Sequence, residues 1–403
     1  MDFPLPHRPG VPLDPGHLRR LRERPLTPVR LPGGHDALLV TRHADVRAVL
    51  AGDGFGREAW TGGTLFARDA PSLALVASDP PTHTRRRRAV QARFTARRAE
   101  ADRPRAEALA ERLLDDLEAA GPPADLLARF ATPLPYALIR DMLGVPAADL
   151  GRLLPWTGAL MSAGHVPAAE VEAARAGMFG YFSALLDARR AAIAAGDPGD
   201  DLLTELLSDP AELLSDPAER LTAEEITVFG LGLFMAGGET TSNFLAACVL
   251  ELIARPDLAA ALRADPSRVP AAVEEFLRWV WFGGTGGRPH VVLAGTRLGG
   301  TALRRGDVVV PLTDAAGRDP DAFPDADAFR PDRSPNPHLG LGHGRHLCLG
   351  APHARMQLQV AITALLRRLD GLDLAIDPAR LRWRERMFVR GVWELPVTWR
   401  PRR

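Results

Sequence analysis

Cysteine is scarce in this chain of 403 residues, which contains only Cys248 and Cys348. The two lie far apart in the sequence and in unlike surroundings. This excludes a disulfide framework of the kind that holds small secreted domains together. Free thiols persist where the environment is reducing, so a cytoplasmic location is expected.

Net charge and long apolar runs are also missing. The 50 basic residues balance 50 acidic ones, which excludes a bulk electrostatic affinity for nucleic acid. No uninterrupted apolar run reaches the ~18 residues of a membrane span. The first residues, Met1 to Pro6, carry neither the basic nor the apolar region of a secretory signal. With 46% hydrophobic residues, the chain is expected to be a soluble globular protein with a large core.

Apolar residues recur with helical spacing through most of the chain, and short alternating runs indicate strands near both ends. The predicted helices are 44–50, 106–118, 168–195, 223–254, 269–280 and 351–369. The predicted strands are 37–41 with a facing segment before it, 291–293, 297–298, 308–311 and 395–399. The pattern predicts a mainly α fold with small β-sheets (α+β), a single domain over 1–403 in which the Pro-rich residues 1–30 wrap the surface.

A seven-residue sequence at 206–212 repeats verbatim at 213–219. Repeat architectures need at least three copies to bury a continuous core. Two Asp-Pro pairs so close together instead predict a turn-rich surface connection.

One of the cysteines lies in a loop of glycines and basic residues, Gly-His-Gly-Arg-His-Leu-Cys-Leu-Gly at 342–350, directly before a helical segment. Helix N-termini and nearby cations stabilise a thiolate, and backbone amides can donate to its sulfur. The arrangement suits a cysteine thiolate that binds a haem iron. Two alternatives stay open: a buried structural Cys348, and a zinc site of the Cys-His₃ type made by His343, His346, Cys348 and His353.

The segment Phe-Met-Ala-Gly-Gly-Glu-Thr-Thr at 234–241 lies inside a long apolar helix. Two glycines, an acid and two threonines are unfavourable in a buried helix, and such a cost is typical of a functional site. Small residues let a ligand approach the backbone, and a threonine hydroxyl can open the helical hydrogen-bond ladder.

Together with two further segments, 79–88 and Glu275-Phe-Leu-Arg278, these motifs resemble those of the soluble bacterial cytochrome P450 monooxygenases, in the same order and spacing from about residue 79 to 399. The resemblance implies a haem b cofactor with Cys348 as its iron ligand. It also implies O₂ as co-substrate and electrons from NAD(P)H, delivered by a ferredoxin or flavodoxin-type partner. Thr240 would hydrogen-bond the oxygen at the haem, and Glu239 would help to relay protons.

The same resemblance assigns the remaining site residues. His83, Arg87, Arg288 and His346 would contact the haem propionates, because buried propionates require cations or donors. Ala236, Gly237 and Gly342 would also contact the haem. Glu275, Arg278 and Arg333 would form a structural network that holds the cysteine loop. The chain departs from the family in having Leu341 where Phe is usual, which should alter redox tuning modestly, and Gly317 where Asn is usual.

A basic patch near the thiolate side of the haem is expected to attract the acidic redox partner; its members would be Arg85, Arg86, Arg88, Arg93, Arg97, Arg98 and Arg355. The substrate pocket is expected to include a glycine-rich loop and a histidine after it, namely Trp281, Phe282, Gly283, Gly284, Thr285 and His290. A phosphate site in this loop is disfavoured, because no Lys-Ser/Thr follows the glycines.

These features predict a monooxygenase that tailors a secondary metabolite, most simply by hydroxylation. The stretch 383–399 is weakly similar to the tail of cytochrome P450 enzymes that couple aromatic cyclic dipeptides. Oxidative C–C or C–N bond or ring formation on an aromatic or cyclic-dipeptide substrate is therefore the second prediction. A non-catalytic haem-binding or zinc-binding protein is the third.

Overall fold

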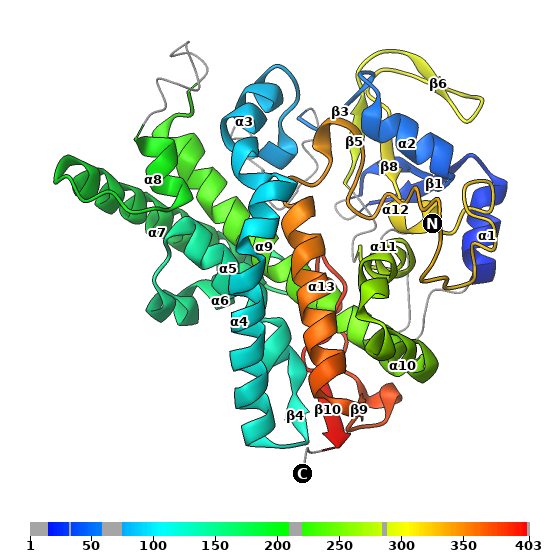
Figure 1. The fold of residues 1–403 in the computed structure, drawn as a ribbon. Helices are drawn as coiled ribbons and strands as arrows, with labels where there is room; N and C mark the ends of the chain where they lie inside the picture. The colour runs from blue at the N-terminus through cyan, green and yellow to red at the C-terminus, as the bar shows by residue number, and fades with distance from the viewer. Residues whose placement is uncertain (1–14, 32–33, 59–74, 209–219, 284–287, 401–403) are drawn as a thin grey trace.

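A computed structural model describes residues 15–31, 34–58, 75–208, 220–283 and 288–400. Its helices surround a long central helix, and its sheets lie at the periphery (Figure 1). The helices are α1 Pro15–Glu23, α2 His43–Ala51, α3 Thr82–Val90, α4 Ala96–Ala120, α5 Pro133–Leu143, α6 Leu150–Leu160, α7 Ala168–Ala194, α8 Leu202–Leu207, α9 Ala223–Ile253, α10 Pro256–Ala264, α11 Val269–Trp279, α12 Thr313–Ala316 and α13 Ala351–Arg368. Among the described helices, none combines the length and the apolar character that crossing a bilayer requires.

The described residues also form three small sheets, which confirms the mainly α fold with small β-sheets. The strands are β1 Leu26–Arg30, β2 Asp36–Val40, β3 Phe55–Gly56, β4 Ala124–Asp125, β5 His290–Val292, β6 Thr296–Leu298, β7 Thr301–Leu303, β8 Val308–Pro311, β9 Asp370–Leu374 and β10 Pro396–Arg400. The largest sheet has the order β1-β2-β8-β5-β3, in which only β2 and β8 run parallel. Strands β4, β10 and β9 form a second sheet, and β6 and β7 a hairpin.

The central helix α9 begins with a capping box. Thr222 Oγ1 accepts from the Glu225 amide at 3.1 Å, and the Glu225 carboxylate accepts from the Thr222 amide at 2.8 Å. The N-terminal half of α9, with Phe234 and Met235, packs in a hydrophobic core shared with α5, α6 and α7. Its C-terminal half, with Leu245, packs in another core shared with α4, α11 and α13. The segment 236–241 lies at the boundary between the two cores.

The predicted helices at 168–195, 223–254, 269–280 and 351–369 are confirmed to within one residue at each end. The helix predicted at 106–118 begins earlier, at Ala96, because Thr95 caps it by accepting from the Arg98 amide at 3.3 Å. The segment predicted to wrap the surface over 1–30 contains regular structure from residue 15 onward, since α1 buries Leu18 and β1 pairs with β2. Most of the repeat, 209–219, falls outside the described residues.

Two glycines of α9 allow helix α5 to approach closely. A Cβ atom on Gly237 would lie 2.9 Å from Cγ1 of Ile139, and one on Gly238 would overlap the ring of Tyr136.

We expect Gly238→Ala to cost about 1–3 kcal/mol of stability through overpacking, seen as a lower melting temperature. Gly232→Ala, on the same helix with open space at its Cβ position, should leave stability unchanged or raised; equal losses in both variants would contradict this account.

Candidate functional site

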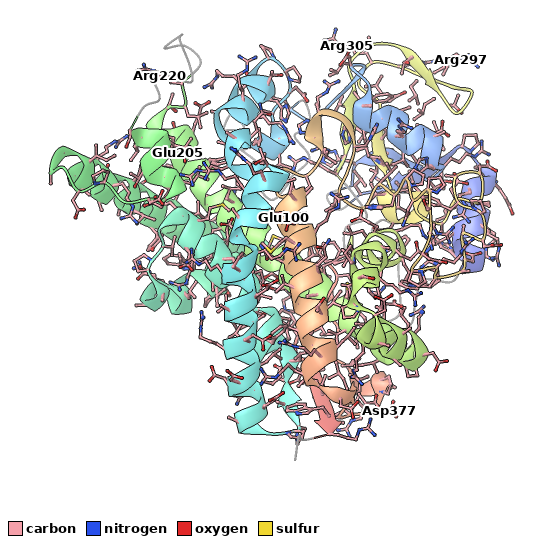
Figure 2. All side chains as sticks on the ribbon, in the orientation of Figure 1. Glu100, Glu205, Arg220, Arg297, Arg305 and Asp377 are labelled. Atoms are coloured by element: carbon pink, nitrogen blue, oxygen red, sulfur yellow. The ribbon has the colours of Figure 1, made fainter. Side chains whose placement is uncertain are left out.

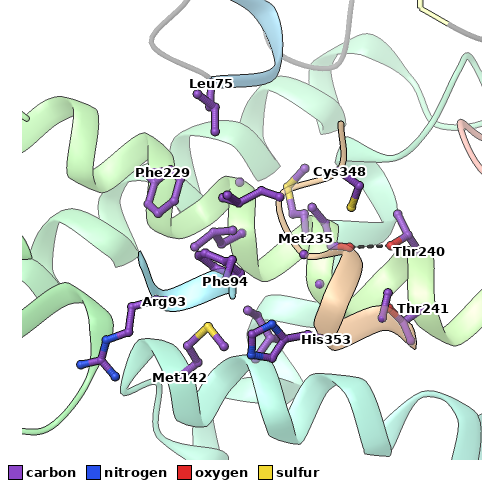
Figure 3. A pocket seen from close by; sticks show the side chains of 18 of the residues that line it. Leu75, Arg93, Phe94, Met142, Phe229, Met235, Thr240, Thr241, Cys348 and His353 are labelled. Atoms are coloured by element: carbon purple, nitrogen blue, oxygen red, sulfur yellow. Dashed lines mark hydrogen bonds between the residues drawn. The ribbon is translucent and has the colours of Figure 1, made fainter. Parts of the chain in front are cut away.

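A cavity of about 730 Å³ lies between α9 and the loop that precedes α13 (Figure 3). Ala236, Gly237, Thr240 and Thr241 line it from α9, and Cys348 lines it from the loop. The volume is in the range of cofactor and small-molecule sites. The glycine-rich helix segment and the cysteine loop, a hundred residues apart in sequence, thus face one space.

The cysteine loop is folded so that the thiol opens into this cavity. The Cys348 amide donates to the Leu341 carbonyl at 2.8 Å, and two glycines, Gly342 and Gly344, adopt positive φ angles of 78° and 68°. At Gly344 a side chain is excluded on two counts, because its Cβ would also lie 2.6 Å from the Leu50 carbonyl oxygen. Burial raises the pKa of the Cys348 thiol, while the Gly350 amide and the charge of Arg87 oppose that rise.

Thr240 and Glu239 face different surroundings. The Thr240 hydroxyl lines the cavity and donates to the Ala236 carbonyl at 2.5 Å. Glu239 is buried behind the helix, where its carboxylate pairs with Arg384 and accepts from the Tyr136 hydroxyl at 3.3 Å. Arg384, which comes from the loop between β9 and β10 and also donates to Asn243 at 2.9 Å, carries no signal in the sequence.

Basic side chains gather at one end of the cavity. His83, Arg87, Arg288 and His346 all line it, as predicted for residues that face one ligand, and the rings of His83 and His346 stand 4.2 Å apart. Burial and then the charge of Arg87 lower the pKa of His83 to about 4, and burial lowers the pKa of Arg288 to about 10. Arg57, which sequence analysis missed, also lines this end.

Buried polar atoms at this end lack partners. Nε2 of His83, Nε2 of His346 and Nε of Arg288 have no hydrogen bond within the described part of the chain. Buried donors and cations are normally satisfied. These atoms therefore fit a ligand that brings carboxylates, such as the two propionates of haem.

Glu275, Arg278 and Arg333 meet as the motif predicts. Arg278 donates to both Glu275 oxygens at 2.6 and 2.8 Å, and Arg333 donates to the same carboxylate at 3.1 Å. The Glu275 and Arg278 side chains are completely buried. The two guanidinium groups also donate to backbone carbonyls of the segment before the cysteine loop, those of Gly317, Pro324, Asp325, Ala326 and Ala328.

The expected substrate-pocket residues are placed elsewhere. Phe282 packs against Phe244, and the Gly283 amide donates to Asp314 at 2.9 Å. Trp281 packs beside the core under the largest sheet, and His290 is buried within that sheet. None of these four is among the described residues that line the cavity; Gly284 and Thr285 lie outside the described residues, so the assignment of this loop to the substrate pocket stays a prediction. The apolar part of the cavity wall comes from other residues, among them Met142, Phe229, Leu233 and Met235.

Most of the expected basic patch is neutralised. Arg85 and Arg86 share the Glu225 carboxylate, and Arg93 pairs with Glu205, which Figure 2 labels. Arg355 forms a bidentate ion pair with Glu274, with N–O distances of 2.7 and 2.9 Å. The exposed members of the patch are Arg88, Arg97 and Arg98.

The zinc alternative has no structural support. In the part of the chain that the structure describes, no group of three or more His, Cys, Asp or Glu side chains is placed to hold a metal ion. His343 accepts from Arg47 at 3.1 Å, and His353 contacts Asp102 at 3.2 Å. Two histidines of the proposed set therefore have separate partners.

Comparisons with known proteins agree with this site. The sequence model of the cytochrome P450 family matches residues 166–371. Over 95% of both chains, the protein is 43% identical to mycinamicin IV hydroxylase/epoxidase of Micromonospora griseorubida. Over 98% of both chains, it is 39% identical to nocardicin C N-oxygenase of Nocardia uniformis subsp. tsuyamanensis. A solved cytochrome P450 with biaryl coupling reactivity has a TM-score of 0.90 at 34% identity, over 99% of this chain and 100% of that one.

The residues around the cavity fit haem b, since one wall presents a thiol and one end presents buried nitrogen atoms of His83, His346 and Arg288 that have no partner among the described residues. The chain therefore belongs to the cytochrome P450 family, as a monooxygenase that uses haem b and takes its electrons from NAD(P)H through a redox partner.

Proposed function

We propose that this monooxygenase hydroxylates an organic small molecule as a tailoring step in the synthesis of a secondary metabolite. The observation that carries the proposal is that Cys348 and Thr240 face the same cavity, whose remaining wall is largely apolar. The names of its relatives, a hydroxylase/epoxidase and an N-oxygenase, support oxygen insertion as the reaction. A cytoplasmic location fits the two unpaired thiols.

Some side chains of the site would hold the cofactor, and others would deliver protons. Haem, when bound, supplies the reductive activation of O₂. Cys348 would hold its iron, and His83, Arg87, Arg288 and His346 would hold its propionates. The Gly350 amide would donate to the Cys348 sulfur and so temper its basicity.

Thr240 would present its hydroxyl to dioxygen once that hydroxyl turns from the Ala236 carbonyl. Glu239 would supply protons to Thr240 Oγ1 from behind the helix. Because Arg384 holds the Glu239 carboxylate away from the cavity, this transfer requires the ion pair to loosen during turnover.

We expect Thr240→Ala to uncouple the enzyme. Without the hydroxyl, proton delivery loses its last donor, and the amount of oxidised product per NAD(P)H consumed should fall about tenfold or more. The measurement is product and hydrogen peroxide formed per NAD(P)H, with a surrogate ferredoxin and reductase. Thr240→Ser, which keeps the hydroxyl, should retain most of the coupling; equal coupling in the Ala and Ser variants would remove Thr240 from the proton path.

Oxidative bond formation is a second candidate, favoured by the similarity in fold to a cytochrome P450 with biaryl coupling reactivity. Mass spectrometry of the product separates the two reactions. Hydroxylation adds one oxygen atom to the substrate, whereas coupling removes two hydrogen atoms and adds no oxygen.

The electron donor is proposed to be an acidic ferredoxin or flavodoxin-type protein that contacts Arg88, Arg97 and Arg98, the exposed members of the basic patch. The rate of electron transfer should then fall as ionic strength rises. A rate that is independent of salt would argue against an electrostatic docking surface.

The experiment that tests the proposed function is an absorption spectrum of the purified protein, reduced and exposed to carbon monoxide. A strongly red-shifted Soret band is expected for thiolate-ligated haem. A colourless protein that contains zinc would overturn the assignment.

A further inference from the structure

Arg57 and His290 form a cross-strand pair at the cationic end of the cavity. Phe55 of β3 pairs with Val292 of β5, and Gly56 pairs with Val291. Continuing this antiparallel register by one residue places Arg57 opposite His290, and side chains that stand opposite each other lie on one face of a sheet. The glycine-rich motif assigns His290 to the substrate pocket, whereas the structure gives its side chain this different partner.

Hydrogen bonds fix the Arg57 side chain. Its Nε donates to Nε2 of His290 at 3.0 Å and its Nη1 to the Val76 carbonyl at 3.2 Å. The Asp79 carboxylate accepts from the Arg57 and Glu58 amides at 2.9 and 3.0 Å. The backbone and two of the three guanidinium nitrogens are therefore anchored.

His290 acts here as a neutral acceptor. Its Nδ1 lies 2.9 Å from the Arg288 carbonyl oxygen. A carbonyl can only accept, so Nδ1 carries the proton and Nε2 offers its lone pair to Arg57. Burial and then the charge of Arg57 lower the pKa of His290 to about 3, which keeps the ring neutral at physiological pH.

The charge of Arg57 is only partly balanced: the nearby Asp79 carboxylate opposes the fall in the pKa of Arg57 but forms no ion pair with its guanidinium group among the described residues. Arg57 is only 9% exposed and lines the cavity, and no ion pair joins Arg57 or Arg288 to an acid within the described ranges. Burial and then the charge of Arg288 lower the pKa of Arg57 to about 9. Two buried guanidinium groups that repel each other are costly unless an anion binds between them.

We infer that Arg57, positioned by His290, binds a carboxylate at this end of the cavity together with Arg288, and that the carboxylate is a haem propionate. Nη2 of Arg57 has no acceptor among the described residues and is the nitrogen left to bind it. This inference rests on the proposed placement of the propionates beside His83 and Arg288, and it adds an arginine from the end of β3 that none of the sequence motifs contains.

The test compares the haem-loaded enzyme with its Arg57→Gln and Arg57→Lys variants. Resonance Raman spectra of Arg57→Gln should show a changed propionate bending mode. Transfer of its haem to excess apomyoglobin should be about tenfold faster, as expected for the loss of one charge-assisted hydrogen bond. Arg57→Lys keeps the positive charge but lacks the planar guanidinium group. Its haem transfer rate should therefore lie between those of the unaltered enzyme and of Arg57→Gln. His290→Leu should shift the same propionate mode, because it removes the acceptor for Arg57. His290→Gln can still accept a hydrogen bond from Arg57 and donate one to the Arg288 carbonyl, so its propionate mode should match that of the unaltered enzyme.

Controls separate this inference from the proposed function. Arg42→Gln removes an equal charge from an arginine that donates to backbone carbonyls away from the cavity and should leave both readouts unchanged. Haem dimethyl ester lacks free carboxylates. Enzyme reconstituted with this ester should therefore lose it at the same rate with and without the Arg57→Gln substitution.

Two results would overturn the inference while the red-shifted carbon monoxide band stays intact. One is an Arg57→Gln variant whose propionate mode and haem transfer rate match those of the unaltered enzyme, as would occur if Arg57 served a substrate carboxylate instead. The other is an equal acceleration with haem and with its dimethyl ester, which would indicate a purely structural role. Loss of the carbon monoxide band in the unaltered enzyme would instead defeat the proposed function.

Discussion

Cys348→Ala is expected to abolish the red-shifted Soret band of the reduced carbon monoxide complex and to reduce monooxygenase turnover to background. Alanine offers the iron no ligand, and the electron donation that favours O–O cleavage comes from the thiolate. Any haem that remains through contacts with His83, Arg288 and His346 would lack this ligand. The measurements are the carbon monoxide spectrum and the yield of oxidised product.

The chain offers a matched control in its only other cysteine. Cys248 is completely buried in the core shared by α4, α9 and α13, so Cys248→Ala should lower stability modestly and leave the spectrum unchanged. A red-shifted band that survives in Cys348→Ala, or disappears in Cys248→Ala, would contradict the assignment of the ligand.

Glu275→Gln is expected to cost about 3–5 kcal/mol of stability and to lower the fraction of protein purified with haem. Gln keeps the shape of the side chain but removes the negative charge that two buried guanidinium groups share, those of Arg278 and Arg333. Since these arginines also bind carbonyls of the segment before the cysteine loop, the loop should loosen as the network fails.

The neighbouring acid on α11 is the control for this prediction. Glu274 binds Arg355 and His338, but both it and Arg355 are about one-third exposed, so Glu274→Gln should cost about 1 kcal/mol or less. Melting temperature and the ratio of haem to protein absorbance measure both variants. Equal losses of stability and haem content in the two variants would show that burial of the Glu275 network does not increase its contribution to stability.

Local features could be predicted well from the sequence, because periodicity and caps act over a few residues. Helix α9 and the cysteine loop both follow from their own residues, and the Glu275 motif predicts the pair with Arg278. Arg57 and Arg384 could not be found in this way. Arg57 is brought to the cavity by the pairing of β3 with β5, and Arg384 reaches Glu239 from a segment more than a hundred residues away.

The glycines of α9 show that a glycine motif can arise for two different structural reasons, namely space for a ligand and close packing against another helix. The pattern at 236–241 indicates room for a ligand, and Gly237 does line the cavity. Gly238 is required by the ring of Tyr136 on α5, and a Cβ atom on Gly237 would also crowd Ile139 of that helix. Nothing in the local sequence distinguishes these two demands, since both select the absence of a side chain.

The division of α9 between two hydrophobic cores has a consequence for how this enzyme can change over evolution. Residues that pack around α5, α6 and α7 form a cluster largely separate from the one around α4, α11 and α13. Free-energy effects of substitutions in separate, non-contacting regions tend to add. Substitutions around α5, α6 and α7 that reshape the cavity for a new substrate can therefore be combined with substitutions around α4, α11 and α13, because their costs in stability should largely add.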